Sequence, residues 1–275
     1  MPLVCMSSPK GGVGKTTLTA NVAHALARAG HRVVVLDLDP QNALRLHFGV
    51  ALHDTAGFWT ASGGDPLSAV RQTTAGPALL PHGSADMHQA LQINASLASN
   101  PALLADPVRR LLADPELILL ADTPPGASQA MAAILPMAAL VVVILLADAA
   151  STALLPQVES GAFLGQGTLA NLVASRARFV LNQVDPASRL SVSAAESVAA
   201  HLGSRLLGAV LRDPAMSEAL AHQRLLLDFA PDSTAARDIR QIAQALAAAL
   251  PKAPPPVAEP APLPRLLDPA SWGRP

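Results

Sequence analysis

Short apolar runs rich in β-branched residues alternate along this chain with longer segments whose apolar positions recur at helical spacing. The short runs predict buried strands at residues 3–7, 32–37, 78–81, 117–122, 140–146, 178–182 and 206–211. The longer segments predict helices at residues 16–29, 102–113, 128–135, 152–164, 191–202, 215–222 and 234–250. This alternation indicates an α/β fold with a mostly parallel, doubly wound sheet and helices on both faces. In such folds, ligands bind beyond the carboxyl ends of the strands.

Two segments depart from this pattern. Residues 54–76 include Gly57, Gly63, Gly64 and Gly76, and predict an irregular stretch. Residues 251–275 contain nine prolines and predict a mobile, extended tail, either without a role or docking a partner through its few apolar residues. We therefore expect one folded domain at residues 1–250, followed by a proline-rich tail.

One apolar run of 18 residues, from Ala130 to Ala147, reaches the length of a membrane span. Pro136 divides it, and the β-branched second half favours a buried parallel strand instead. The chain enters its first strand without a basic segment followed by an apolar one, so no secretory signal is expected. The single cysteine, Cys5, excludes an intramolecular disulfide, fits a reducing cytosol, and is expected to be a small core residue.

The segment between the first predicted strand and helix carries the strongest chemical signal. A strand, a glycine-rich loop and a helix form the phosphate-binding loop of many nucleotide-binding proteins. The glycines leave backbone N–H groups free for phosphate oxygens, Lys15 supplies charge at the β- and γ-phosphates, and the Thr16 hydroxyl is placed to hold Mg²⁺. The common pattern has glycine at position 9, where this chain has Pro9, and Lys10 is an additional lysine. The motif reads Lys10-Gly11-Gly12-Val13-Gly14-Lys15-Thr16-Thr17.

Acidic residues follow two other predicted strands. Asp39, just beyond the second strand, is the candidate for orienting the attacking water near the γ-phosphate and Mg²⁺, and Asp37 is expected to brace the same loop. Asp122 ends a buried strand and fits the Walker B position, accepting a hydrogen bond from a Mg²⁺-bound water or from Thr16. Ordinary turn aspartates are the alternative for Asp37 and Asp39.

Asn182 ends a further predicted strand. Its amide offers both the donor and the acceptor that an adenine edge requires, although a cap or turn role is an open alternative. The eight histidines lack metal-site spacing and are expected on the surface or in packing roles.

Together these motifs, with the late segment 230–237, resemble the ParA/MinD group of deviant Walker A ATPases over residues 1–250. Segments 42–49, 79–83 and 211–219 are similar to its BcsQ branch of bacterial cellulose-biosynthesis ATPases. The resemblance implies ATP and Mg²⁺ as cofactors and an ATP-sandwich homodimer in which Lys10 reaches the partner's nucleotide. It also implies catalytic roles for Lys10, Lys15 and Asp39, a metal site at Thr16, Asp39 and Asp122, and nucleoside contacts from Arg212, Asp213 and Pro214.

The function implied by this resemblance is a slow, partner-stimulated ATPase switch. It would assist the assembly, localisation or regulation of a cellulose synthase complex through cytoplasmic protein partners, at the inner face of the cytoplasmic membrane. A DNA-partitioning ATPase is one alternative, although three lysines in the whole chain argue against nonspecific DNA binding. A MinD-type regulator would need an amphipathic C-terminal helix, which the prolines of residues 251–275 disfavour. A scaffold that binds ATP tightly and hydrolyses little remains a third alternative.

Overall fold

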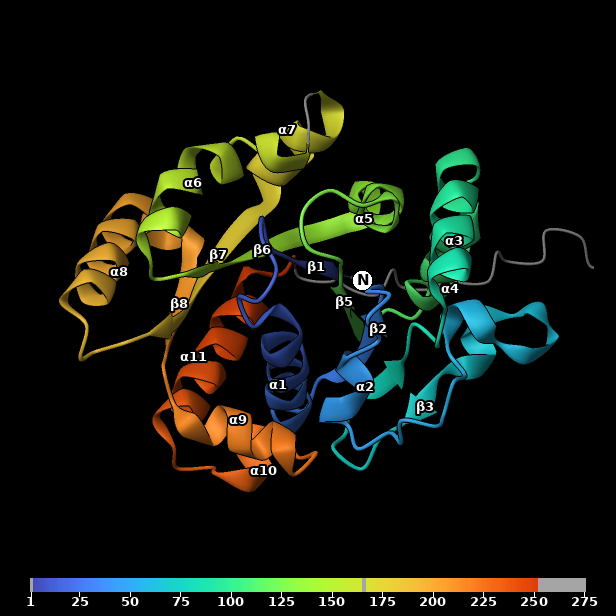
Figure 1. Ribbon diagram of the computed structural model, residues 1–275, viewed down its shortest axis with the longest axis horizontal. Helices are drawn as coiled ribbons and strands as arrows, with labels where there is room; N and C mark the ends of the chain where they lie inside the picture. Colours follow the sequence, from blue (N-terminus) through green and yellow to red (C-terminus); the bar gives the residue numbers. More distant parts are fainter. Residues whose placement is uncertain (1, 165–166, 252–275) are drawn as a thin grey trace, which may run out of the picture.

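The computed structural model describes residues 2–164 and 167–251. Eight strands form one sheet in the order β3-β4-β2-β5-β1-β6-β7-β8 (Figure 1). Every neighbouring pair is parallel except β3 and β4, so the predicted α/β class is confirmed. In sheet order the strands are β3 Arg71–Gln72, β4 Ala78–Leu80, β2 Arg32–Asp37, β5 Leu117–Asp122, β1 Leu3–Ser7, β6 Ala138–Leu146, β7 Ala177–Val184 and β8 Leu206–Leu211.

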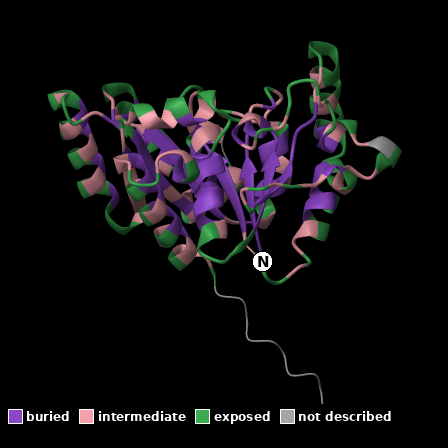
Figure 2. Ribbon diagram, turned by 90° about the horizontal axis from the view of Figure 1, so that it is seen from below, coloured by how far each residue is buried: buried purple, intermediate pink, exposed green. Residues whose placement is uncertain are grey.

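Helices cover both faces of the sheet and bury its central strands (Figures 1 and 2). One face packs against α1 Lys15–Arg28, α2 Leu44–His47, α9 Pro214–Ala221, α10 Leu226–Phe229 and α11 Thr234–Ala249. The other face packs against α3 Met87–Ser99, α4 Ala102–Leu111, α5 Gln129–Ile134, α6 Ala149–Glu159, α7 Thr168–Arg176 and α8 Arg189–Leu202. Alanine, leucine and valine supply most of both cores.

The apolar run 130–147 folds as α5, a short 3-10 turn and β6. Seven of the nine residues of β6 are buried. The strand lies between its parallel neighbours β1 and β7, which explains its continuous apolar character. Within the described residues, no helix is long and apolar enough to cross a membrane. Cys5 is buried in β1 as expected, and burial raises the pKa of its thiol to about 12.

Several elements differ from the expectation. Helices α2, α3, α7 and α10 and the edge strand β3 were not predicted, and α6 begins at Ala149 and ends at Glu159 rather than spanning 152–164. Residues 54–76 form 3-10 turns and β3. The predicted tail lies outside the described residues except for Pro251.

The strand order brings three distant motifs to one edge of the sheet. Strands β2, β5 and β1 are neighbours, and each ends at the same edge because they are parallel. Asp37 pairs in register with Asp122, and the glycine loop follows β1 directly beside them. This carboxyl edge is therefore the place to look for the site.

Candidate nucleotide site

The phosphate loop, residues 8–14, ends in a helix start that lacks a side-chain cap. Gly14 is the N-cap of α1 at φ 84°, and Gly12 lies at φ 77°, a region that favours glycine. Within the part of the chain that the structure describes, no side chain caps the N-terminus of α1. These unpaired amides at a helix N-terminus suit an anion such as a phosphate group.

Lys15 and Thr16 converge on the buried carboxylate of Asp122. The Lys15 ammonium lies 2.7 Å from Asp122 Oδ1, and the Thr16 hydroxyl donates to Oδ2 at 2.7 Å. The Thr19 hydroxyl donates mainly to the Lys15 carbonyl at 2.9 Å, with a longer contact of 3.3 Å to Asp122. Asp122 is completely buried, so burial raises the pKa of its carboxyl while the Lys15 charge and the hydrogen bonds oppose that rise. Lys15 and Thr16 of the phosphate loop and the strand-end Asp122, predicted from two separate motifs, thus form one connected group.

Asp37 braces the acidic loop, residues 38–43. Its carboxylate accepts the backbone N–H groups of Asp39 at 3.0 Å and Leu44 at 3.1 Å. Burial raises the pKa of Asp37 well above its usual 3.8, and the neighbouring Asp122 raises it further. The Asp39 carboxylate is partly exposed and, among the described residues, accepts only the Gln41 N–H, at 3.0 Å, so it can turn toward a ligand.

The donor set fits a nucleotide with Mg²⁺. Asp37, Asp39 and Asp122 bring three carboxyl groups to this edge, and Lys15 is the one cation that pairs with any of them among the described residues. A hard divalent ion prefers carboxylate and hydroxyl oxygens, and the Thr16 hydroxyl adds one of the latter. Thr16, Asp39 and Asp122 would hold the ion, while the loop amides and Lys15 would hold the phosphates.

Lys10 lies apart from this group. Its ammonium is 3.0 Å from Asp148 Oδ2, at the N-terminus of α6, and both side chains are about one-third exposed. Asp148 Oδ1 accepts the Ser151 N–H at 2.7 Å, so this carboxylate also caps α6. Sequence reasoning missed Asp148, although it follows the end of β6 just as Asp122 ends β5.

A cavity of about 480 Å³ adjoins the phosphate loop and holds the predicted nucleoside residues. Asn182 lies at its edge, where its Nδ2 donates to the Val13 carbonyl at 2.8 Å. Both carboxylate oxygens of Asp213 accept backbone N–H groups, from Ala215 and Ala235. The remaining walls include Gly14, Thr17, Leu18, Gln183, Arg212, Pro214 and Met216.

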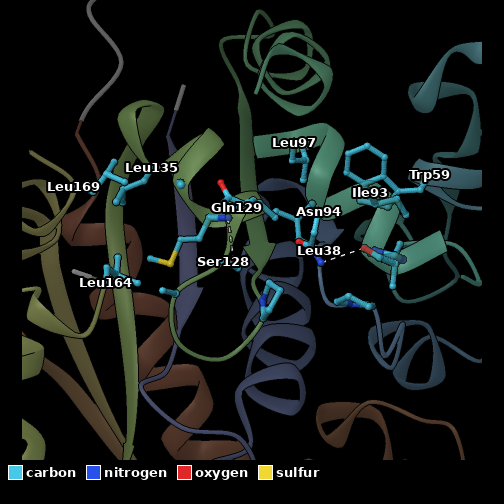
Figure 3. Close-up of a pocket in the computed structure, with 18 residues that line it drawn as sticks. Leu38, Trp59, Ile93, Asn94, Leu97, Ser128, Gln129, Leu135, Leu164 and Leu169 are labelled. Atoms are coloured by element: carbon cyan, nitrogen blue, oxygen red, sulfur yellow. Dashed lines mark hydrogen bonds between the residues drawn. The ribbon is translucent and has the colours of Figure 1, made fainter. Parts of the chain in front are cut away.

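On the other side of the acidic loop lies a larger, mainly apolar cavity of about 650 Å³ (Figure 3). Ile93, Asn94 and Leu97 of α3 border it together with Trp59, and Leu135, Leu164 and Leu169 lie at its opposite end. Leu38 and Ser128 connect it to the loops that follow β2 and β5. Among residues 2–164 and 167–251, no lysine, arginine, aspartate or glutamate lines it, so these walls do not suit phosphate.

The histidines form no common site. His47 is buried, its Nε2 lies 3.4 Å from the Thr17 hydroxyl, and burial lowers its pKa to about 4, which keeps the imidazole neutral. His82 is buried beside Trp59. In the parts of the chain that the structure describes, no three histidine, cysteine or acidic residues are placed to hold a metal by themselves.

The loop, its lysine and the strand-end aspartate place this chain among the P-loop nucleotide-binding proteins of the ParA/MinD type. A family model described as cellulose biosynthesis protein BcsQ matches residues 1–246. The chain therefore belongs to the BcsQ family, within the ParA/MinD group of ATPases.

Relatives and solved structures agree with this assignment. The chromosome-partitioning ATPase Soj of Thermus thermophilus is 29% identical over 252 residues, which cover 88% of this chain and 93% of Soj. An uncharacterised ATP-binding protein of Methanocaldococcus jannaschii is 30% identical over 251 residues, covering 88% of this chain and 86% of that protein. The fold matches MinD of Pyrococcus horikoshii complexed with Mg-ADP at a TM-score of 0.70 and 21% identity, covering 89% of this chain and 95% of that one.

The contact between Asn182 and the phosphate loop gives a first prediction. A Cβ on Gly14 would lie 2.3 Å from Asn182 Nδ2, whereas a Cβ on Gly12 would meet nothing within 4 Å. Both positions have a positive φ, so Gly12→Ala and Gly14→Ala share the same backbone strain. Because Gly14→Ala also displaces the Asn182–Val13 hydrogen bond, we expect it to lower the free energy of unfolding by roughly 1–2 kcal/mol more than Gly12→Ala. Urea denaturation measures the difference, and equal losses would show that Asn182 does not brace the loop.

Proposed function

We propose that this chain is an ATP-dependent dimeric switch with slow, partner-stimulated ATPase activity. In this proposal it assists the assembly, localisation or regulation of a bacterial cellulose synthase complex. The BcsQ family match supports the cellulose role, and ATPases are the common chemistry of the ParA/MinD relatives. We further propose that it acts in the cytoplasm and meets the membrane through its protein partners.

The position of Lys10 is the main observation that supports a dimeric switch. Lys15 forms an ion pair with the buried Asp122 inside the site. Lys10 instead forms an ion pair at the surface with the partly exposed Asp148. An exposed ion pair of this kind contributes about 0.2–1 kcal/mol and can open at little cost. Lys10 is therefore available to reach the nucleotide of a second copy, where a lysine from outside would offset phosphate charge as an arginine finger does.

In the proposed reaction the residues divide the work. Lys15 and the loop amides bind the phosphates, Asp39 orients the attacking water, and Lys10 of one protomer stabilises charge in the other protomer's site. Mg²⁺, when bound with ATP at Thr16, Asp39 and Asp122, supplies positive charge to the phosphate oxygens. Hydrolysis releases the γ-phosphate, which Lys10 of the other protomer contacts in this proposal, and its loss loosens the dimer.

Replacing Lys10 should separate nucleotide binding from dimer formation. We expect Lys10→Ala to bind ATP as the wild type does but to remain monomeric with a non-hydrolysable ATP analogue, because the cross-subunit cation is lost. Light scattering measures the mass, and calorimetry measures the affinity. A Lys10→Ala protein that dimerises normally would refute the cross-subunit role.

Asp148→Asn is the matched variant for that experiment. Asparagine keeps an oxygen for the Ser151 N–H at the start of α6 but removes the charge that holds Lys10. Freeing Lys10 should lower the concentration at which the ATP-bound dimer forms by up to about 5-fold. An unchanged or weaker dimer would argue that the ion pair does not compete with dimerisation.

The likeness to Soj over 88% of this chain supports a second candidate, a DNA-partitioning ATPase. That function requires ATP-dependent binding to nonspecific DNA that weakens steeply with salt. Fluorescence anisotropy with a random duplex at two salt concentrations distinguishes the two candidates. A third candidate, a scaffold that holds ATP without cleaving it, is supported if a single turnover leaves bound ATP intact.

A further inference from the structure

The mainly apolar cavity beside the acidic loop has no part in the proposed function, although it is larger than the cavity at the phosphate loop. Its volume is about 650 Å³, and the half-buried Trp59 and Ile93 line it together with the buried Leu97 and Leu135 (Figure 3). Helix α3, which forms one wall, fully buries only Leu97 of its 13 residues. The described residues therefore leave most of this helix uncovered.

The described walls of this cavity are uncharged. Besides apolar side chains they include His82, Asn94 and Ser128, and burial lowers the pKa of His82, which keeps its imidazole neutral at pH 7. Trp59 packs edge to face against Phe58, with ring centroids 4.6 Å apart. Aromatic-lined grooves bind proline-rich segments in the polyproline II form. The cavity thus favours an apolar, proline-rich occupant over an anion.

A segment of this chemistry follows the described part of the chain. Residues 252–275 lie outside the described residues, and their sequence contains eight prolines. Their largest apolar side chains are concentrated in the second half, at Leu263, Leu266, Leu267 and Trp272. Burial of each leucine contributes about 1.5–3 kcal/mol, and prolines reduce the conformational entropy that docking costs.

The end of α11 places this segment within reach of the cavity. The Ala235 N–H at the start of α11 donates to Asp213, just after β8, and the Ile242 side chain lies beside Gly208, so α11 runs toward the amino ends of the strands. The cavity lies at the carboxyl ends, and the six-residue strand β5 spans about 20 Å between the two edges. Residues 252–265 extend to about 43 Å in the polyproline II form, which is about twice that height.

We propose that residues 263–272 of the same chain dock in this cavity, against Trp59. Leu38 and Pro40 line the cavity on either side of Asp39, so the docked segment packs against the acidic loop. The proposal goes beyond the ATPase function and does not depend on it, because none of the lining residues is assigned to the nucleotide.

Trp59 reports the docked state once Trp272 is replaced. The chain has two tryptophans, so full-length Trp272→Phe keeps an aromatic side chain in the tail and leaves Trp59 as the single tryptophan. In this background we expect Leu266→Ser with Leu267→Ser to shift Trp59 emission to longer wavelength and to increase its quenching by iodide, because water replaces apolar side chains at the ring. Val257→Ser is the matched control, because it removes an apolar residue outside the docking segment.

Two substitutions on α3 show whether the tail binds in the cavity. Ala90 lines the cavity, whereas Ala95 is exposed on the same helix and does not line it. Ala90→Arg fills the cavity, so the two leucine substitutions should cause no further change in Trp59 emission or quenching in that variant. They should keep their full effect beside Ala95→Arg.

All measurements are made without nucleotide and over a range of protein concentrations, so a failure of the proposed ATPase function leaves their outcome unchanged. Identical Trp59 signals with and without the two leucines would overturn the proposal. So would an effect of the leucines that persists in Ala90→Arg. A signal that depends on protein concentration would assign the segment to the cavity of a second copy and overturn docking within one chain.

Discussion

Lys15→Ala is expected to abolish useful ATP binding and to destabilise the fold at the same time. Lys15 is 6% exposed and Asp122 is completely buried, so removing the lysine leaves a carboxylate without its cation in the protein interior. Breaking a buried ion pair in this way costs about 3–5 kcal/mol. The lost charge-assisted contacts to phosphate should lower ATP affinity on the order of 100-fold. Urea denaturation and calorimetry measure the two effects separately.

Lys10→Ala is the matched control, because it removes the other lysine of the same loop. Lys10 is about one-third exposed and pairs with a partly exposed aspartate, so its loss should cost less than about 1 kcal/mol. The double variant Lys15→Ala with Asp122→Asn removes the stranded charge and should regain stability without regaining ATP affinity. If Lys15→Ala binds ATP like the wild type, the loop is not a phosphate site.

The positions of the phosphate loop and of the strand-end aspartates could be predicted from sequence because each depends on a local pattern. The runs that became β1, β2 and β5 are continuous and apolar, and a glycine loop or an aspartate follows at the carboxyl end. Parallel strands then bring such ends to one edge whatever the order of the strands. The hydrogen bond from Thr16 to Asp122 was expected on this basis, whereas the ion pair of Lys15 with Asp122 was not.

The helix α3 shows where local pattern was insufficient. Of its 13 residues only Leu97 is fully buried, and the exposed apolar residues Met87 and Leu91 obscure the stripe that Ile93 and Leu97 form. Its N-terminus is fixed instead by a capping box, in which Asp86 and Gln89 each accept the other's backbone N–H. The capping residues therefore mark the start of α3 more clearly than its apolar pattern does.

Contacts between residues far apart in the chain could not be predicted from the sequence. The pair of Lys10 with Asp148 joins positions 138 residues apart, and the pair of Asn182 with Val13 joins positions 169 apart. The sequence also gave no sign of the extra residue in β7 that exposes Gln183, because a bulge depends on the register with β8.

Asp39→Ala is expected to slow ATP cleavage by about 10²- to 10⁴-fold in a single turnover, the usual contribution of a general base. The Asp39 carboxylate is partly exposed and has a single backbone partner, so it can face the water that attacks the γ-phosphate. The buried Asp37 cannot replace it, because its carboxylate oxygens already hold the Asp39 and Leu44 N–H groups. ATP binding should persist, since Lys15 and the loop amides are unchanged. Rapid mixing with labelled ATP measures the rate of cleavage at saturating protein.

Asp39→Asn separates the chemistry from the shape of the loop. Its side-chain oxygen can still accept the Gln41 N–H, so the acidic loop keeps its turn while the carboxylate is lost. If orientation of water by the carboxylate limits the rate, Asp39→Asn and Asp39→Ala should be slowed to a similar degree. A slow Asp39→Ala beside a normal Asp39→Asn would assign the defect to loop geometry. Wild-type rates in both variants would remove Asp39 from the mechanism and require the water to be oriented from elsewhere, because the remaining carboxylates at this edge are engaged in the fold.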